Sequence, residues 1–193
     1  MEFYFMIFRR ITILISIACL ASGVVWAADQ PKVRIETTAG DFVVELNESR
    51  APLSVQNFLQ YVQSGFYEGT IFHRVMSGFV IQGGGLNAKL EAKATQDPIP
   101  NESRNGLSNV RMSIAMARTS DPHSADSQFY INLVDNLSLD ATPDSWGYTV
   151  FGRVVDGMNV VDDIGGRPTG PQGGMQDVPA APVIIENTVL IPQ

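Results

Sequence analysis

Apolar and polar residues alternate in two short stretches, residues 33–37 and 42–46, which are separated by a turn containing Gly40. Alternation places successive side chains on opposite faces of a strand, so these stretches predict a β-hairpin. From residue 51 onward the apolar residues recur every three or four positions instead, with Pro52 at the start and Gly65 at the end. That spacing predicts an amphipathic helix directly after the hairpin.

The rest of the chain is predicted to form short strands joined by polar loops. Residues 85–109 are polar and interrupted by prolines, which indicates a long surface loop with one possible helical turn near Leu90. Residues 118–126 and the Gly/Pro-rich residues 167–182 are also predicted to be irregular. Many short strands with only two helices favour a closed antiparallel barrel, with a β-sandwich as the alternative. The further predicted strands are residues 71–76, 79–82, 113–117, 128–133, 148–154 and 183–191, and the second predicted helix is residues 157–164.

Two of these strands indicate which side chains face the core. In one of them, Phe129 and Ile131 share the core face, whereas Gln128, Tyr130 and Asn132 share the opposite face. The strand near residue 115 presents only alanine methyl groups on that opposite face. A face with glutamine and tyrosine beside small side chains could form a peptide-binding groove, and an ordinary solvated sheet face is the alternative.

The first residues have the pattern of a secretory signal peptide. A basic Arg9-Arg10 pair precedes an almost wholly apolar segment at residues 11–20, and small residues lead up to Ala27-Ala28. We expect cleavage after residue 27 or 28 and export to a bacterial periplasm. An uncleaved inner-membrane anchor is the alternative, although the apolar run is short for a membrane span. Cys19, the chain's one cysteine, lies within the apolar segment.

The expected organisation is a signal peptide of residues 1–27 followed by a single domain of residues 28–193. The formal net charge of the chain is −7, and no basic run occurs in the domain, so nucleic acid and anionic membranes are poor candidate partners. Two histidines and no cysteine within the domain make a zinc site improbable. We expect a monomer with no metal, no cofactor and no stable membrane association after the signal is removed.

Residues 72–84 carry the most informative motif of the chain. Arg74 and Gln82 stand among aromatic and aliphatic residues, and the stretch ends in paired glycines. It contains no cysteine, no carboxylate and a single histidine. Such a stretch can bind an apolar peptide and donate hydrogen bonds to it, but it is poorly equipped for covalent catalysis.

This motif strongly resembles the signature of the cyclophilin-type peptidyl-prolyl cis–trans isomerases. Residues 114–118, 127–131 and 150–158 resemble further family motifs and follow in the family's order. The resemblance runs from about residue 33 to residue 191 and is greatest to exported bacterial members. It implies a mainly β fold, a closed eight-stranded antiparallel barrel capped by two helices, with the active groove on the outer wall. It also implies that the partners are proline-containing polypeptides, such as unfolded exported proteins.

The resemblance assigns site residues by position. Arg74 matches the family's catalytic arginine. Ser138 stands where tryptophan is usual, which implies that cyclosporin binds weakly. Tyr130 stands where phenylalanine is usual, so its hydroxyl must find a partner near an apolar pocket. The residues that match the family's substrate-binding positions are Phe79, Val80, Gln82, Ala117, Arg118, Gln128, Tyr130, Leu139 and Tyr148.

These residue types suit rotation about a proline peptide bond. Conjugation of nitrogen with the carbonyl gives the bond a rotation barrier of about 18–20 kcal/mol, whereas cis and trans X-Pro forms differ by only about 0.5–1 kcal/mol. A guanidinium aimed at the nitrogen lone pair would bind the twisted state better than the planar one. A binding module that holds proline segments without turnover is the first alternative. A hydrolase using His123, with Ser124 and Asp126 nearby, is the second.

Overall fold

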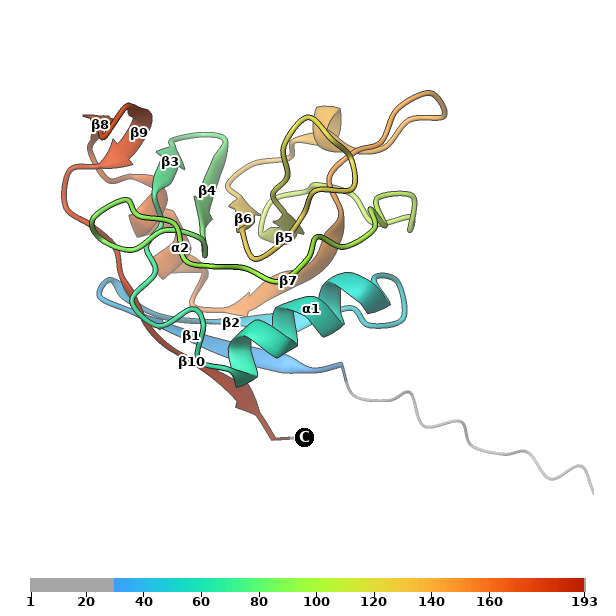
Figure 1. The fold of residues 1–193 in the computed structure, drawn as a ribbon, viewed down its shortest axis with the longest axis horizontal. Helices are drawn as coiled ribbons and strands as arrows, with labels where there is room; N and C mark the ends of the chain where they lie inside the picture. Colours follow the sequence, from blue (N-terminus) through green and yellow to red (C-terminus); the bar gives the residue numbers. More distant parts are fainter. Residues whose placement is uncertain (1–29, 193) are drawn as a thin grey trace, which may run out of the picture.

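The computed structural model describes residues 30–192, so the predicted signal peptide and its cleavage site lie outside the described residues. One antiparallel eight-stranded sheet dominates the fold, in the order β10-β1-β2-β7-β5-β6-β4-β3 (Figure 1). A separate two-stranded sheet pairs β8 with β9. The elements are β1 Lys32–Thr37, β2 Gly40–Leu46, α1 Pro52–Gln63, β3 Arg74–Met76, β4 Val80–Gly83, β5 Ser113–Met116, β6 Phe129–Asn132, a 3₁₀ turn Leu137–Leu139, β7 Val150–Asp156, α2 Met158–Gly165, β8 Thr169–Gln172, β9 Met175–Pro179 and β10 Ile185–Ile191.

The sheet is an open half-barrel, so the predicted closed barrel is wrong. Its edge strands β3 and β10 do not pair with each other along their length. The segments that precede them meet at an isolated bridge between Ile71 and Ile184. On one edge Gly69 N bonds to Ile185 O (2.9 Å) and Phe72 N to Val183 O (3.0 Å), and on the other edge Ile71 N bonds to Leu86 O (2.9 Å). Regular strand pairing begins only at Arg74, which pairs with Gln82 of β4, so the predicted strand 71–76 is shorter in the structure.

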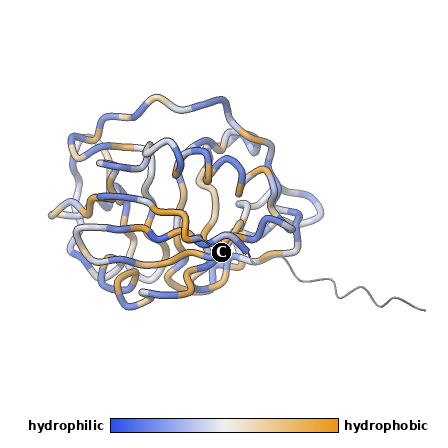
Figure 2. Tube along the Cα trace, turned by 90° about the horizontal axis from the view of Figure 1, so that it is seen from below, coloured by the Kyte–Doolittle hydropathy of each residue, from blue (hydrophilic) through white to orange (hydrophobic). Residues whose placement is uncertain are grey.

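The predicted facing of the strands is confirmed. Phe129 and Ile131 lie in the main core, where Phe58 of α1 packs edge-on against Phe129 at a ring-centroid distance of 5.6 Å. Tyr130 and Ala115 lie on the opposite face, in a second apolar cluster. That face is covered rather than solvated, since Tyr130 is only 4 % exposed. Figure 2 shows hydrophobic (orange) and hydrophilic (blue) segments interleaved along the chain.

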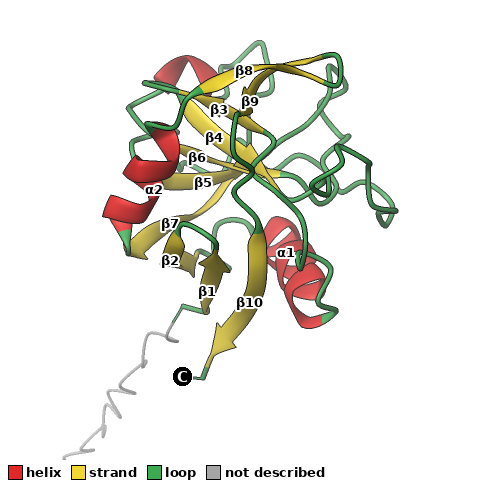
Figure 3. Ribbon diagram, turned by 90° about the vertical axis from the view of Figure 1, so that its left-hand side faces the viewer, coloured by secondary structure: helices red, strands yellow, loops and turns green. Residues whose placement is uncertain are grey.

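The two helices pack against different parts of the sheet (Figure 3): α1 lies against β10, and α2 lies against β2, β3 and β4. The N-cap residue of α1 forms no side-chain cap. Glu102 of the long loop caps the helix instead, because its carboxylate accepts hydrogen bonds from Leu53 N (3.0 Å), Ser54 N (2.8 Å) and Ser54 Oγ (2.7 Å). A carboxylate at a helix N-terminus satisfies unpaired amides and complements the helix dipole. The long loop is thus fixed to the body of the protein.

Two predictions for the loop segments of the chain are wrong. Residues 167–182 contain the β8–β9 hairpin, whose Gly173-Gly174 turn has positive φ at both residues. Pro171 and Pro179 make these strands look like loop residues in the sequence, but proline is tolerated in edge strands such as those of a two-stranded hairpin. Near Leu90 the chain forms a tight turn with φ of 63°, not a helical turn. Elsewhere the predicted and observed bounds agree to within about two residues.

Candidate active site

The strand register brings the predicted site residues onto one face. Arg74 of β3 pairs with Gln82 of β4, and Gln82 in turn pairs with Tyr130 of β6. Tyr130 pairs with Ala115 of β5. Directly opposed residues on neighbouring strands point to the same face, so these four side chains form a row across the sheet. The period-two pattern of each strand is what places a cation, an amide and a phenol side by side.

A pocket of about 140 Å³ opens along this row. It contains every predicted site residue except Gln128, which lies in an adjoining hollow of about 160 Å³ together with Thr119, Ser124 and Asp126. The two hollows share Gln82, Ala117 and Arg118. The residues lining the first are Arg74, Phe79, Val80, Gln82, Ala117, Arg118, Tyr130, Leu139 and Tyr148.

Hydrogen bonds orient the guanidinium of Arg74. Its Nη1 donates to Gln82 Oε1 (3.3 Å), and Gln82 Nε2 donates to Gln128 Oε1 (3.1 Å). Among residues 30–192 Arg74 forms no ion pair, so no carboxylate draws its charge away from the pocket. Gln128 has room for this role because Gly85 lacks a side chain: a Cβ there would lie 2.5 Å from Gln128 Cγ.

The paired glycines serve two purposes. Gly84 has a φ of 82°, as expected for a turn that favours glycine. Gly83 and Gly85 have ordinary φ values and are needed for close approach instead: a Cβ on Gly83 would lie 2.9 Å from Ile71 O. A positive φ therefore explains one glycine of the run, and tight packing explains the others.

The apolar part of the pocket is built around two tyrosines. The rings of Tyr130 and Tyr148 meet edge to face, with centroids 5.8 Å apart. Burial, followed by the neighbouring Tyr148 and Asp140, raises the pKa of Tyr130, so its phenol stays protonated. The hydroxyl finds its required partner in Asn109, to whose Oδ1 it donates at 2.7 Å. Sequence reasoning missed Asn109, although the unusual tyrosine signalled that such a partner must exist.

Arg118 holds the neighbouring loop rather than pointing its donors into the pocket. Its guanidinium lies 4.4 Å from the Tyr148 ring centroid and donates to the backbone oxygens of Gly147 (3.3 Å), Trp146 (3.1 Å) and Thr119 (2.9 Å). Trp146 itself is absent from the pocket lining and packs on the guanidinium of Arg104 and the ring of His123.

The residues proposed for a hydrolytic triad are not assembled. Among the described residues, no hydrogen bond joins His123 to Ser124 or Asp126. Ser124 Oγ donates to Asp121 O (2.7 Å) and accepts from Thr119 Oγ1 (2.7 Å), while His123 Nδ1 accepts from Asn101 N (3.1 Å). A serine nucleophile requires a base within hydrogen-bonding reach, so this geometry does not favour hydrolysis.

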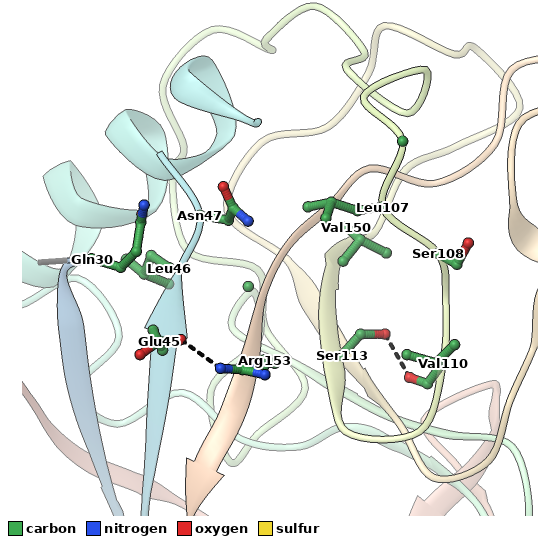
Figure 4. Close-up of a pocket in the computed structure, with 12 residues that line it drawn as sticks. Gln30, Glu45, Leu46, Asn47, Leu107, Ser108, Val110, Ser113, Val150 and Arg153 are labelled. Carbon is green, nitrogen blue, oxygen red and sulfur yellow. Dashed lines mark hydrogen bonds and ion pairs between the residues drawn. The ribbon is translucent and has the colours of Figure 1, made fainter. Parts of the chain in front are cut away.

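A wider hollow of about 540 Å³ lies on another part of the surface (Figure 4). It runs between β2, β7 and the segment around residue 107, and the ion pair of Glu45 and Arg153 (3.0 Å) crosses its wall. None of the predicted site residues lines it. In the described part of the chain, no cluster of three or more His, Cys, Asp or Glu side chains could bind a metal. Nor does any helix between residues 30 and 192 have the length and apolar character to cross a membrane.

Comparisons with known proteins identify the family of the chain. Residues 32–190 match the family model for cyclophilin type peptidyl-prolyl cis-trans isomerase/CLD. The chain is 54% identical over 162 residues to isomerase cyp18 of Streptomyces antibioticus, covering 82% of this chain and 98% of the relative. It is 52% identical over 161 residues to isomerase B of Escherichia coli K12, with the same coverage of 82% and 98%.

Solved structures agree with the fold. A cyclophilin type isomerase of Cryptosporidium parvum, crystallised in the presence of the dipeptide Ala-Pro, superimposes with a TM-score of 0.72 at 29% identity, covering 84% of this chain and 99% of that one. The motifs, the fold and the relatives point to the same conclusion. The chain belongs to the cyclophilin family and is a peptidyl-prolyl cis–trans isomerase.

Proposed function

We propose that the pocket beside Arg74 is where isomerisation takes place and that Arg74 is the catalytic residue. The observation that carries this proposal is the row in which Arg74, Gln82 and Tyr130 lie side by side on paired strands. It sets a permanent cation at the rim of an apolar pocket. The proline ring would occupy the pocket, with its nitrogen turned toward the guanidinium.

The chemistry requires a donor and a clamp. When the X-Pro bond twists, conjugation is lost and nitrogen regains a basic lone pair. A guanidinium N–H aimed at that lone pair stabilises the twisted state selectively, which lowers the barrier. Gln82 accepts a hydrogen bond from one N–H of Arg74 and thereby fixes the orientation of the guanidinium. The other N–H groups of the guanidinium remain available to the substrate. No bond to the enzyme forms, so neither a nucleophile nor a metal takes part.

The apolar walls would hold the ring while the preceding carbonyl swings. Phe79, Val80, Tyr130, Leu139 and Tyr148 line the pocket. Ala117 adds little bulk beside them, so an extended peptide could approach its backbone. The presence of Ala-Pro in crystals of the related Cryptosporidium enzyme supports a proline-containing peptide as substrate.

We further propose that the enzyme is a monomer exported to the periplasm, where it assists the folding of exported proteins and binds cyclosporin weakly. The sequence pattern of residues 1–28 supports export, and the absence of tryptophan at residue 138 supports weak cyclosporin binding. Cell fractionation combined with mass spectrometry of the protein's N-terminus tests export. A periplasmic form beginning at residue 28 or 29 is expected, and a full-length membrane-bound form would contradict it.

Exchange NMR on an X-Pro peptide tests the catalytic assignment. Arg74→Ala should keep the fold but lower kcat/KM by about a hundredfold, because a preorganised donor of this type contributes on the order of 3 kcal/mol. Arg74→Lys retains the charge but not the fork, so it should rescue activity only in part. Arg34→Ala removes an exposed arginine on β1 and serves as the matched control.

The outcomes distinguish the alternatives. Near-wild-type turnover in Arg74→Ala would refute the assignment. Peptide binding without accelerated exchange in the wild type would indicate a binding module. New peptide termini, detected by mass spectrometry of the treated substrate, would indicate a hydrolase.

A further inference from the structure

A buried amide lies directly behind the proline pocket. Asn109 is fully buried, whereas its chain neighbours Ser108 and Val110 are exposed and line the outer hollow of Figure 4. Asn109 does not line the pocket of Arg74. Its Oδ1 nevertheless accepts the hydroxyl of Tyr130 at 2.7 Å, and Tyr130 does line that pocket.

Both ends of the Asn109 side chain and both of its backbone polar atoms have partners. Oδ1 also accepts from Asn132 Nδ2 (3.2 Å), and Nδ2 donates to Asp140 Oδ1 (2.8 Å) and to Tyr148 O (3.5 Å). The backbone N–H donates to the same Asp140 oxygen (2.7 Å), and the backbone carbonyl accepts from Asn136 N (2.7 Å). Replacing this residue therefore disturbs several buried groups at once.

The partners belong to separate walls of the pocket. Tyr130 and Tyr148 are lining residues themselves, and Asp140 directly follows the lining residue Leu139. Phe79 forms a further wall of the pocket, and Asn136 connects it to Asn109: Nδ2 of Asn136 donates to Phe79 O (3.0 Å). These walls come from β6, from the loop before β7, from the 3₁₀ turn and from the turn before β4, so local sequence cannot hold them together.

We propose that Asn109 is a positioning residue of the isomerase reaction: through its hydrogen bond with the hydroxyl it holds the ring of Tyr130 against the proline pocket. The inference rests on the proposed pocket at Arg74. A buried hydroxyl that loses its acceptor seeks another partner or water, and the ring that carries it then moves. Small displacements of groups that position a substrate reduce turnover strongly.

A double-mutant comparison tests this role. Asn109→Ala is made with Tyr130 in place and again in the Tyr130→Phe background, and kcat/KM of the folded protein is measured by exchange NMR. With Tyr130 present, Asn109→Ala should lower kcat/KM by about tenfold. With phenylalanine at residue 130 no hydroxyl is left without an acceptor, so the same substitution should lower kcat/KM by much less. An equal fall in both backgrounds, or no fall with Tyr130 present, would overturn the proposal.

Controls separate positioning from general destabilisation. Thr37→Ala removes a buried hydroxyl that bonds to Gly40 O (2.6 Å) in the β1–β2 turn, far along the sheet from Arg74. It should lower stability without changing kcat/KM of the folded protein. If Asn109→Ala does not fold, Asn109→Ser, which is too short to reach both Tyr130 and Asp140, is compared in the same two backgrounds. Loss of activity in Arg74→Ala alongside background-independent effects at Asn109 would overturn this inference alone and leave the catalytic assignment standing.

Discussion

Acidification should destabilise the folded protein through one buried histidine, His73. His73 is only 3 % exposed. Burial lowers the pKa of His73 from 6.5 to about 4. The Ile71 backbone opposes this shift in the pKa in part, and the charge of Arg74 adds to it. Among residues 30–192, Nδ1 of His73 has no hydrogen-bond partner. The folded protein therefore keeps this imidazole neutral where an exposed histidine would already be charged.

The sign and size of the effect follow from the two pKa values. The folded-state pKa lies below that of the unfolded chain, so as pH falls the unfolded chain binds the proton first. The contribution to stability is intact above about pH 6.5 and is lost progressively down to about pH 4. A difference of about 2.5 between the pKa values corresponds to about 3 kcal/mol in the free energy of unfolding. That is a large part of the roughly 5–15 kcal/mol typical of a domain.

Urea unfolding of three proteins between about pH 7.5 and pH 4 measures this contribution. The wild type should lose about 3 kcal/mol more than His73→Gln over this range, because carboxylate titration is common to both and cancels in the difference. His123→Gln removes the chain's other histidine, which is exposed, and should follow the wild type. Identical pH dependence in the wild type and His73→Gln, or an NMR titration midpoint for His73 near 6.5, would refute the reasoning.

Three further substitutions test how the site is supported. Glu102→Ala removes the cap of α1 and should lower the free energy of unfolding by about 1–2 kcal/mol in urea, whereas the exposed Glu186→Ala should have little effect. Gly85→Ala should displace Gln128 and lower kcat/KM several-fold, whereas Gly170→Ala, with open space at its Cβ, should not; unchanged kinetics in Gly85→Ala would show that Gln128 is not needed. Arg118→Gln should speed hydrogen exchange across residues 141–147, because it loses its bonds to the backbone there; unchanged protection would contradict this.

Much of the site could be predicted because its residues lie on strands. The alternation in residues 128–132 predicted that Tyr130 and Phe129 face opposite sides of the sheet, and the two side chains lie in different apolar clusters of the structure. Side-chain direction in a strand depends only on local geometry, so a short pattern determines it. The resemblance supplied the identity of the residues that share a pocket, and the register of β3, β4 and β6 explains why they meet.

The features that the sequence did not predict depend on contacts between distant segments. The partner of the Tyr130 hydroxyl lies 21 residues away in a loop with no periodic pattern. Residues 69–72 bond to residues 183–185 while β3 itself does not pair with β10, and alternation within a strand cannot reveal where such pairing ends. The β8–β9 hairpin was missed because Pro171 and paired glycines resemble loop residues when their strand partners are unknown.

The register that aligns Arg74, Gln82 and Tyr130 also limits how the gene can change. Inserting or deleting one residue in β4 would turn Gln82 toward the core and bring an apolar neighbour beside the guanidinium. Indels in homologous enzymes should therefore accumulate in the stretches between strands, such as residues 141–147, while the spacing from residue 74 to residue 82 stays constant.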